Sequence, residues 1–87
     1  MPGWDAATRR QSRKVLEQVV LLGTPATNWW AYSDVVGRRL KVTPNELYDA
    51  VQLLIKEGDV ESNTKDCYAM RATLRGWVKA QGVWDSP

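Results

Sequence analysis

Three polar side chains, Asn45, Tyr48 and Gln52, stand at intervals that place them on one face of a helix beginning near residue 44. Amide side chains can form two hydrogen bonds with adenine in the DNA major groove, so Asn45 and Gln52 are candidates to read bases. Tyr48 is a candidate to contact a phosphate or a thymine methyl. Other roles stay open, because Asn is common in the first turn of a helix for local backbone reasons and Tyr48 can pack at the edge of the core.

Basic side chains that could bind phosphate lie on either side of this helix. The strongest group, at the end of the preceding helix, is Arg38, Arg39 and Lys41. The full set of candidate phosphate contacts is Arg38, Arg39, Lys41, Thr43, Lys56, Lys65 and Arg71. Further positive charge comes from the first helix, at Arg9, Arg10, Arg13 and Lys14. The alternative is that these charges are solvated helix faces without a ligand.

The net charge of +2 is distributed unevenly along the chain. Residues 1–41 hold seven Lys or Arg against three Asp or Glu, a net charge of +4, whereas residues 42–66 hold two against six, a net charge of −4. Phosphates near the helix would meet Glu46, Asp49 and Glu57, at an electrostatic cost. A second interpretation is therefore open, in which the acidic helix and the segment after it bind a partner protein and not DNA.

The composition argues against catalysis and metal binding. The chain has no histidine, the commonest general base and metal ligand, and its one cysteine, Cys67, can form neither an internal disulfide nor a cysteine-based metal cluster. Glu46 and Asp49 lack the burial pattern of a tuned pair of acids. We therefore expect no enzyme activity, no cofactor and no small-molecule substrate.

Length and hydropathy indicate one small domain over residues 1–87. No apolar run approaches the ~18 residues that a membrane span needs, and the first five residues lack the basic-then-apolar order of a signal peptide. The sequence predicts a cytoplasmic protein with no membrane partner.

Two consecutive helices have to position the polar face. They are expected over 34–40 and 44–57, joined by the tight link Lys41-Val42-Thr43. Thr43-Pro44-Asn45-Glu46 has the pattern of a capping box with proline at the first helical position, which fixes where the second helix begins. Its core stripe is Leu47, Ala50, Val51 and Leu54. The pair predicts a helix-turn-helix, whose second helix commonly enters the DNA major groove.

The remaining elements surround this pair. A first helix is expected over 6–22, with Val15 and Val19 on its core face, and a short strand is expected between Thr24 and Tyr32. The alternating stretches of 59–71 predict a β-hairpin in which Val60, Tyr68 and Met70 face inward and Ala69 faces outward. A last helix is expected over 74–81. The predicted class is α+β, mainly α, with the elements in the order of a winged helix and the hairpin as its wing.

The segment TPNELYDAVQLLIKEGDVES resembles the recognition helix and first wing strand of winged-helix transcriptional regulators, most of all the PadR-like group. The residues that carry this resemblance are Leu47-Tyr48, Gly58-Asp59-Val60 and the later stretch Tyr68 to Thr73. Similar motifs recur in MarR-like regulators. The resemblance implies a winged helix-turn-helix that binds double-stranded DNA as a transcriptional repressor or directionality factor of a bacterium or phage. Leu53 and Ile55 depart from the group, which usually has charged residues at those positions.

Apolar side chains outside the expected core indicate an interface. The chain has five tryptophans and no phenylalanine, and Trp is enriched at binding hot spots. Leu53 lies roughly 110–120° around its helix from the core stripe. We therefore expect Leu53, Trp77 and Trp84 to support a homodimer, or to bind a partner protein in the second interpretation. The alternative is that these tryptophans fill a small core and that Leu53 packs under the C-terminal segment.

Overall fold

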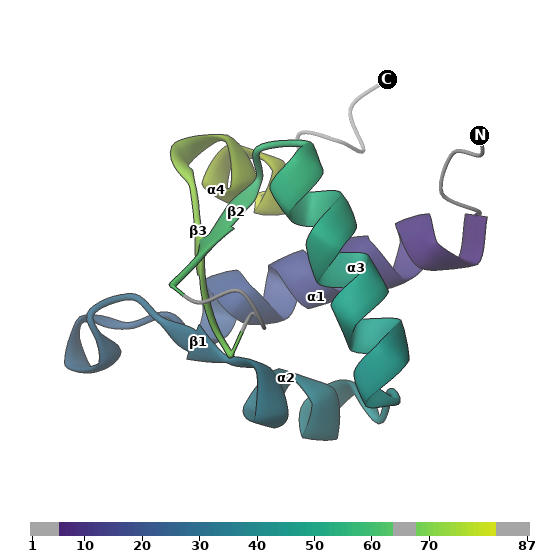
Figure 1. The fold of residues 1–87 in the computed structure, drawn as a ribbon. Coiled ribbons are helices and arrows are strands. Elements are labelled where there is room, and N and C mark those ends of the chain that lie inside the picture. Colours follow the sequence, from purple (N-terminus) through teal and green to yellow (C-terminus); the bar gives the residue numbers. More distant parts are fainter. Residues whose placement is uncertain (1–5, 64–67, 82–87) are drawn as a thin grey trace.

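A computed structural model describes residues 6–63 and 68–81 of the chain. Within these ranges the protein is a small domain of four α-helices and one three-stranded antiparallel sheet (Figure 1). The helices are α1 (Ala6–Leu22), α2 (Ser33–Leu40), α3 (Pro44–Lys56) and α4 (Leu74–Ala80). The strands are β1 (Ala31–Tyr32), β2 (Val60–Ser62) and β3 (Ala69–Ala72), in the order β1-β3-β2. The expected α+β class with helices in the majority is confirmed.

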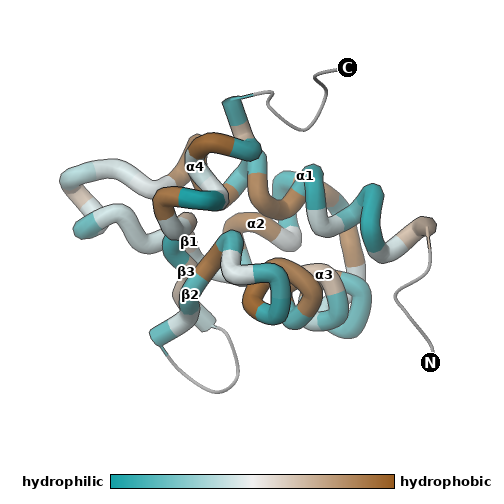
Figure 2. Tube along the Cα trace, turned by 90° about the horizontal axis from the view of Figure 1, so that it is seen from above, coloured by the Kyte–Doolittle hydropathy of each residue, from teal (hydrophilic) through white to brown (hydrophobic). Residues whose placement is uncertain are grey.

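The core lies where α3 crosses α1 (Figure 1). The expected packing is confirmed, because one buried cluster contains the six predicted residues Val15, Val19, Leu47, Ala50, Val51 and Leu54, together with Val36 from α2. Met70 from β3 closes the cluster on the side of the sheet. Seen from above in Figure 2, α1 and α3 lie on opposite sides of the helical part of the molecule, and hydrophobic positions recur along both helices. The two helices therefore supply most residues of the buried cluster.

The turn between α2 and α3 is held by two local devices. The N–H of Glu46 donates to Oγ1 of Thr43 (3.2 Å), and the N–H of Thr43 donates to Oε1 of Glu46 (2.9 Å), so the capping box forms as expected. The bond from the Thr43 N–H holds the pKa of Glu46 below its ordinary value, and the Thr43 side chain lowers it further. At the end of α2, Lys41 takes a left-handed conformation (φ 57°) that redirects the chain into α3.

A buried carboxylate, which the sequence analysis did not identify, joins α3, the sheet and α4. Asp59 is 1% exposed, and its carboxylate accepts hydrogen bonds from Nζ of Lys79 (2.7 Å) and Nε of Arg75 (3.2 Å). Its N–H donates to the carbonyl of Leu54 (2.9 Å), and its carbonyl accepts from the N–H of Thr73 (3.0 Å). These contacts fix α4 against the end of α3.

Gly76 is required by the same junction. A Cβ atom at this position would lie 2.0 Å from the carbonyl oxygen of Asp59, a distance that no side chain tolerates. The Thr73 hydroxyl caps α4 by accepting the N–H of Gly76 (3.2 Å) and donates to the carbonyl of Gly58 (2.6 Å). The first turn of α4 is therefore fixed by Thr73 and Gly76, and Lys79 in its last turn adds the bond to Asp59.

The short strand expected between Thr24 and Tyr32 is confirmed, but it occupies only the last two residues of that segment. A 3-10 turn occupies Pro25–Thr27, Trp29 has a left-handed backbone (φ 70°), and β1 begins only at Ala31. The two adjacent tryptophans thus precede the strand and do not alternate across it. Their segment projects from the body of the domain beside β1 (Figure 1).

The hairpin pairs β2 with β3, with Val60 opposite Ala72 and Ser62 opposite Met70. Val60 and Met70 are buried, as expected from the alternation. Two assignments are wrong, because Tyr68 is exposed and Ala69 is buried. Ala69 lies opposite Tyr32, and the Tyr32 and Tyr68 rings contact each other with centroids 5.5 Å apart, so aromatic side chains cover the face that was expected to be open.

We predict that Leu54→Ala destabilises the protein by about 2–5 kcal/mol, because it leaves a cavity where α3 meets α1. Urea unfolding followed by circular dichroism measures the change. Leu21→Ala is the matched control, since Leu21 is exposed on the same pair of packed helices, and its expected effect is below about 0.5 kcal/mol. Equal midpoints for the two variants would contradict the assigned core.

We predict that Asp59→Asn lowers the free energy of unfolding by about 1.5–3 kcal/mol, the range for hydrogen bonds to charged groups. The expected loss of stability is moderate because the side chains of Arg75 and Lys79, once they lack the carboxylate, can turn to solvent and stay hydrated. The comparison is Glu61→Gln, which removes an exposed pair with Arg71 and should cost no more than about 1 kcal/mol. If both substitutions have the same effect in urea unfolding, Asp59 does not hold the junction.

Candidate functional site

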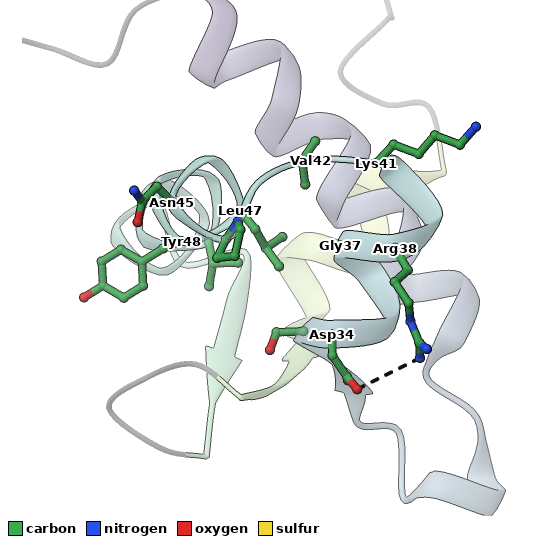
Figure 3. Close-up of a pocket in the computed structure, with 11 residues that line it drawn as sticks. Asp34, Gly37, Arg38, Lys41, Val42, Asn45, Leu47 and Tyr48 are labelled. Atoms are coloured by element: carbon green, nitrogen blue, oxygen red, sulfur yellow. Dashed lines mark ion pairs between the residues drawn. The ribbon is translucent and has the colours of Figure 1, made fainter.

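The outer face of α3 presents two of the three predicted polar residues to solvent. Asn45 and Tyr48 are exposed, Tyr48 to 47%, and both project away from α2 (Figure 3). Gln52 is half-buried one turn further along the same face. The capping box fixes the residue at which α3 begins. The buried stripe on the opposite side of α3 fixes the rotation of the helix about its axis, so that the polar face points to solvent. The three residues are therefore brought together on one side of α3.

A groove of about 700 Å³ separates this face from α2. Its walls are largely apolar, with Leu47 and Val42 between the two helices (Figure 3). The groove is open because α2 turns two small residues, Ser33 and Gly37, toward α3. A Cβ atom at Gly37 would lie 3.5 Å from the Leu47 side chain, an ordinary contact distance, so α2 does not press against α3 at this point. The outer face of α3 is therefore not covered by α2.

The basic residues of the α2–α3 turn divide into two groups. Arg38 is 76% exposed in its side chain and forms a long ion pair with Asp34 (4.0 Å) on the groove side. Lys41 is also exposed and extends away from the groove (Figure 3). Arg39 instead donates from Nε to Oε1 of Gln18 on α1 (2.7 Å). Arg38 and Lys41 thus flank the start of α3, and Arg39 does not.

The other expected phosphate contacts are arranged less favourably. Thr43 is used by the capping box, and Lys56 is exposed at the far end of α3. Arg71 donates to Oε2 of Glu61 (2.8 Å), and its guanidinium lies 4.4 Å from the ring centroid of Trp30. Arg71 is thus occupied by partners in its own chain. Lys65 lies outside the described residues.

Three of the five described acids after residue 42 form ion pairs within the fold. Glu57 lies 3.7 Å from Arg9 and 3.9 Å from Lys79, Asp59 binds Arg75 and Lys79, and Glu61 binds Arg71. On the outer part of α3, the acids that remain are Glu46, which returns to the N–H of Thr43, and Asp49. The sequence analysis missed these pairs because the cations come from the two ends of the chain. The i, i+4 spacing of Arg75 and Lys79 was the available signal for Asp59.

The expectation that Leu53 offers an exposed apolar contact is wrong. Leu53 is 2% exposed, because the buried side of α3 widens toward its C-terminal end, where Leu53 and Leu54 face α1 residues such as Arg9 and Ser12. A buried side chain is not available to a partner. Trp84 lies outside the described residues.

An apolar surface does exist on the outer side of α4. Trp77 is half-buried and contacts Trp29 edge to face, with ring centroids 6.4 Å apart. Beside it Leu74 is 82% exposed, and Val78 is exposed one turn further on. The chain therefore presents Leu74, Val78 and Trp29 around the Trp77 ring, in the region where the sequence predicted an interface.

In the part of the chain that the structure describes, no helix is long and apolar enough to cross a membrane. Within residues 6–63 and 68–81, no three His, Cys, Asp or Glu side chains come together in a way that could hold a metal ion.

Comparisons of the chain with models of protein families, with curated proteins and with solved structures gave no significant match.

Proposed function

We propose that this protein is a sequence-specific DNA-binding regulator of the winged-helix type, which inserts α3 into the major groove. The observation that carries the proposal is the outer face of α3, where Asn45 and Tyr48 project into solvent, with the exposed cations Arg38 and Lys41 across the groove at the end of α2. The order of elements supports the same proposal: helix, short strand, two helices joined by a tight turn, hairpin and closing helix.

Each part of this face has a distinct role in the proposal. A major groove about 12 Å wide admits an α-helix, and amide side chains such as Asn45 and Gln52 can read adenine there. Arg38 and Lys41 would contact phosphates on one side of the groove and fix the register of the helix. Tyr48 would contact a thymine methyl or a phosphate. The β2–β3 hairpin would lie against the neighbouring backbone as the wing.

The internal ion pairs reduce the electrostatic cost of this arrangement. Counted along the sequence, residues 42–66 carry a net charge of −4, which opposes DNA. Glu57, Asp59 and Glu61 are neutralised by cations within the fold, and the Glu46 carboxylate is bound to its own backbone. Asp49 is the acid that remains on the polar side of α3. One such charge can be outweighed by Arg38 and Lys41.

We predict two different effects of substitutions on DNA binding. Replacing Arg38 and Lys41 with Gln should weaken binding about equally for all sequences and reduce the salt slope by roughly 0.9 per lost contact. Asn45→Ala or Gln52→Ala should relax preference at one base position, by about 1–3 kcal/mol. Fluorescence anisotropy with a selected duplex and its single-base variants, repeated over a salt series, measures both effects.

The control for this experiment is Lys56→Gln, a single charge change at the far end of α3, which should alter affinity less than the change at Arg38 and Lys41. A uniform loss from every substitution would mean that Asn45 and Gln52 read no bases. Unchanged affinity in all variants would exclude α3 as the DNA-binding element.

A second candidate function is supported by the apolar surface of α4. In this second function the chain is a protein-interaction module. Another protein binds the apolar surface formed by Leu74, Val78 and the Trp29–Trp77 pair. The same surface would serve a homodimer of the DNA-binding regulator, since two-fold symmetry would place two α3 helices on two half-sites.

We predict that the protein forms a homodimer through this surface. Leu74→Glu, at the most exposed apolar position, should shift it to a monomer without unfolding it, and Trp77→Ala should have the same effect. Sedimentation equilibrium at micromolar concentration, with circular dichroism as the check on folding, measures the change. A wild-type protein that remains monomeric even on DNA contradicts the dimer and favours a partner protein at α4.

A further inference from the structure

Several cations that make no ion pair lie away from α3. Among the described residues, Arg9, Arg38, Arg71, Arg75 and Lys79 each pair with a carboxylate. Five others, Arg10, Lys14, Arg39, Lys41 and Lys56, are exposed and form no ion pair with an acid in the described part of the chain. Three of the five, Arg10, Lys14 and Arg39, belong to α1 and the end of α2.

These cations form a continuous row. Arg10, Lys14 and Gln18 follow each other at intervals of four residues, about 6 Å along the helix axis at each step, and so lie on one side of α1. Gln18 accepts the hydrogen bond from Nε of Arg39, which extends the row onto α2. We call Arg10, Lys14, Gln18 and Arg39 the α1 strip. Glu17 is the exposed acid beside it.

The α1 strip and the outer face of α3 point in opposite directions. The buried residues of α1, Val15, Leu16 and Val19, face α3, and Arg10 and Lys14 stand on the other side of the same helix. In α3 the buried stripe likewise faces α1, and Asn45 and Tyr48 stand on the far side. Figure 1 shows α1 behind α3, and Figure 2 shows the two helices on opposite sides of the helical part. A straight duplex in contact with α3 cannot also reach the strip.

We propose that the α1 strip is a second DNA-binding surface, which holds the phosphate backbone of another duplex segment while α3 occupies the first. The proposal rests on the proposed function for the first duplex. A row of exposed cations matches a continuous line of phosphates, and such binding needs neither a pocket nor base contacts. The strip carries no aromatic side chain of the kind that anchors protein interfaces, so its chemistry fits a polyanion better than a folded partner.

The test is the capture of a second duplex. A duplex with a selected site is fixed to beads, the wild-type protein is added, and a fluorescent duplex of unrelated sequence is offered at low salt. The protein should retain the fluorescent duplex. The double variant Arg10→Gln/Lys14→Gln should bind the bead-fixed duplex like the wild type and retain about tenfold less of the second duplex. Glu17→Gln, which removes the neighbouring acid, should retain more than the wild type does.

Three results would overturn the proposal, and they are distinguishable. If the wild type binds the first duplex through α3 but retains no second one, the α1 strip has no DNA-binding role and the proposed function stands. If the double variant retains the second duplex fully, a dimer with two α3 faces bridges the duplexes. If the double variant loses the first duplex while Asn45→Ala and Gln52→Ala retain it, α1 is the sole DNA-binding face and the insertion of α3 is wrong as well.

Discussion

The arrangement of this domain depends on one buried carboxylate. Asp59 follows directly after α3 and Gly58, and its side chain and backbone bind α3, the start of α4 and two cations on α4. A charge removed from water is costly unless it is paired and hydrogen-bonded, so the chain can bury Asp59 only if α4 returns to this point. Gly76 permits the close approach, since any larger residue would collide with the Asp59 carbonyl. The end of α3 and the direction of α4 are thus set by the same requirement.

Local signals in the sequence were sufficient for the parts of the fold with local causes. The Thr43–Glu46 capping box needs only four consecutive residues, and the stripes of α1 and α3 need only helical periodicity, so the pattern placed the core and the polar face of α3 correctly. Asp59 could not be identified in this way, because next to the inward-facing Val60 it takes the position of an outward-facing polar residue of a strand, and only the folded chain brings Arg75 and Lys79 to it. The burial of Leu53 was not predicted for a related reason. The angular width of the buried face of a helix depends on where neighbouring helices cross it, and the sequence of one helix does not contain that information.

The distribution of charge likewise depends on which distant residues meet in the fold. Counting residues along the chain gives an acidic middle segment, yet Glu57, Asp59 and Glu61 meet cations from α1, β3 and α4. After these pairs form, the unpaired positive charge of the described residues lies at the α2–α3 turn, along α1 and at Lys56, and the unpaired acid Asp49 remains on α3. A partner protein that recognises an acidic helix would therefore find little acidic charge there, whereas the exposed apolar side of α4 can still form a protein interface.

The contact between Arg71 and Trp30 has a consequence for the rigidity of the proposed binding face. Arg71 joins β3 to the segment before β1, and the N–H of Ser33 at the start of α2 donates to the carbonyl of Tyr68 next to β3 (2.8 Å). The hairpin and α2 are therefore tied to each other, and α2 is tied to α3 by a three-residue turn. A ligand that touches all three elements would meet a surface whose conformational freedom was largely lost when the chain folded. Less entropy then remains to be lost on binding, and pre-organisation of this kind raises affinity without adding a contact.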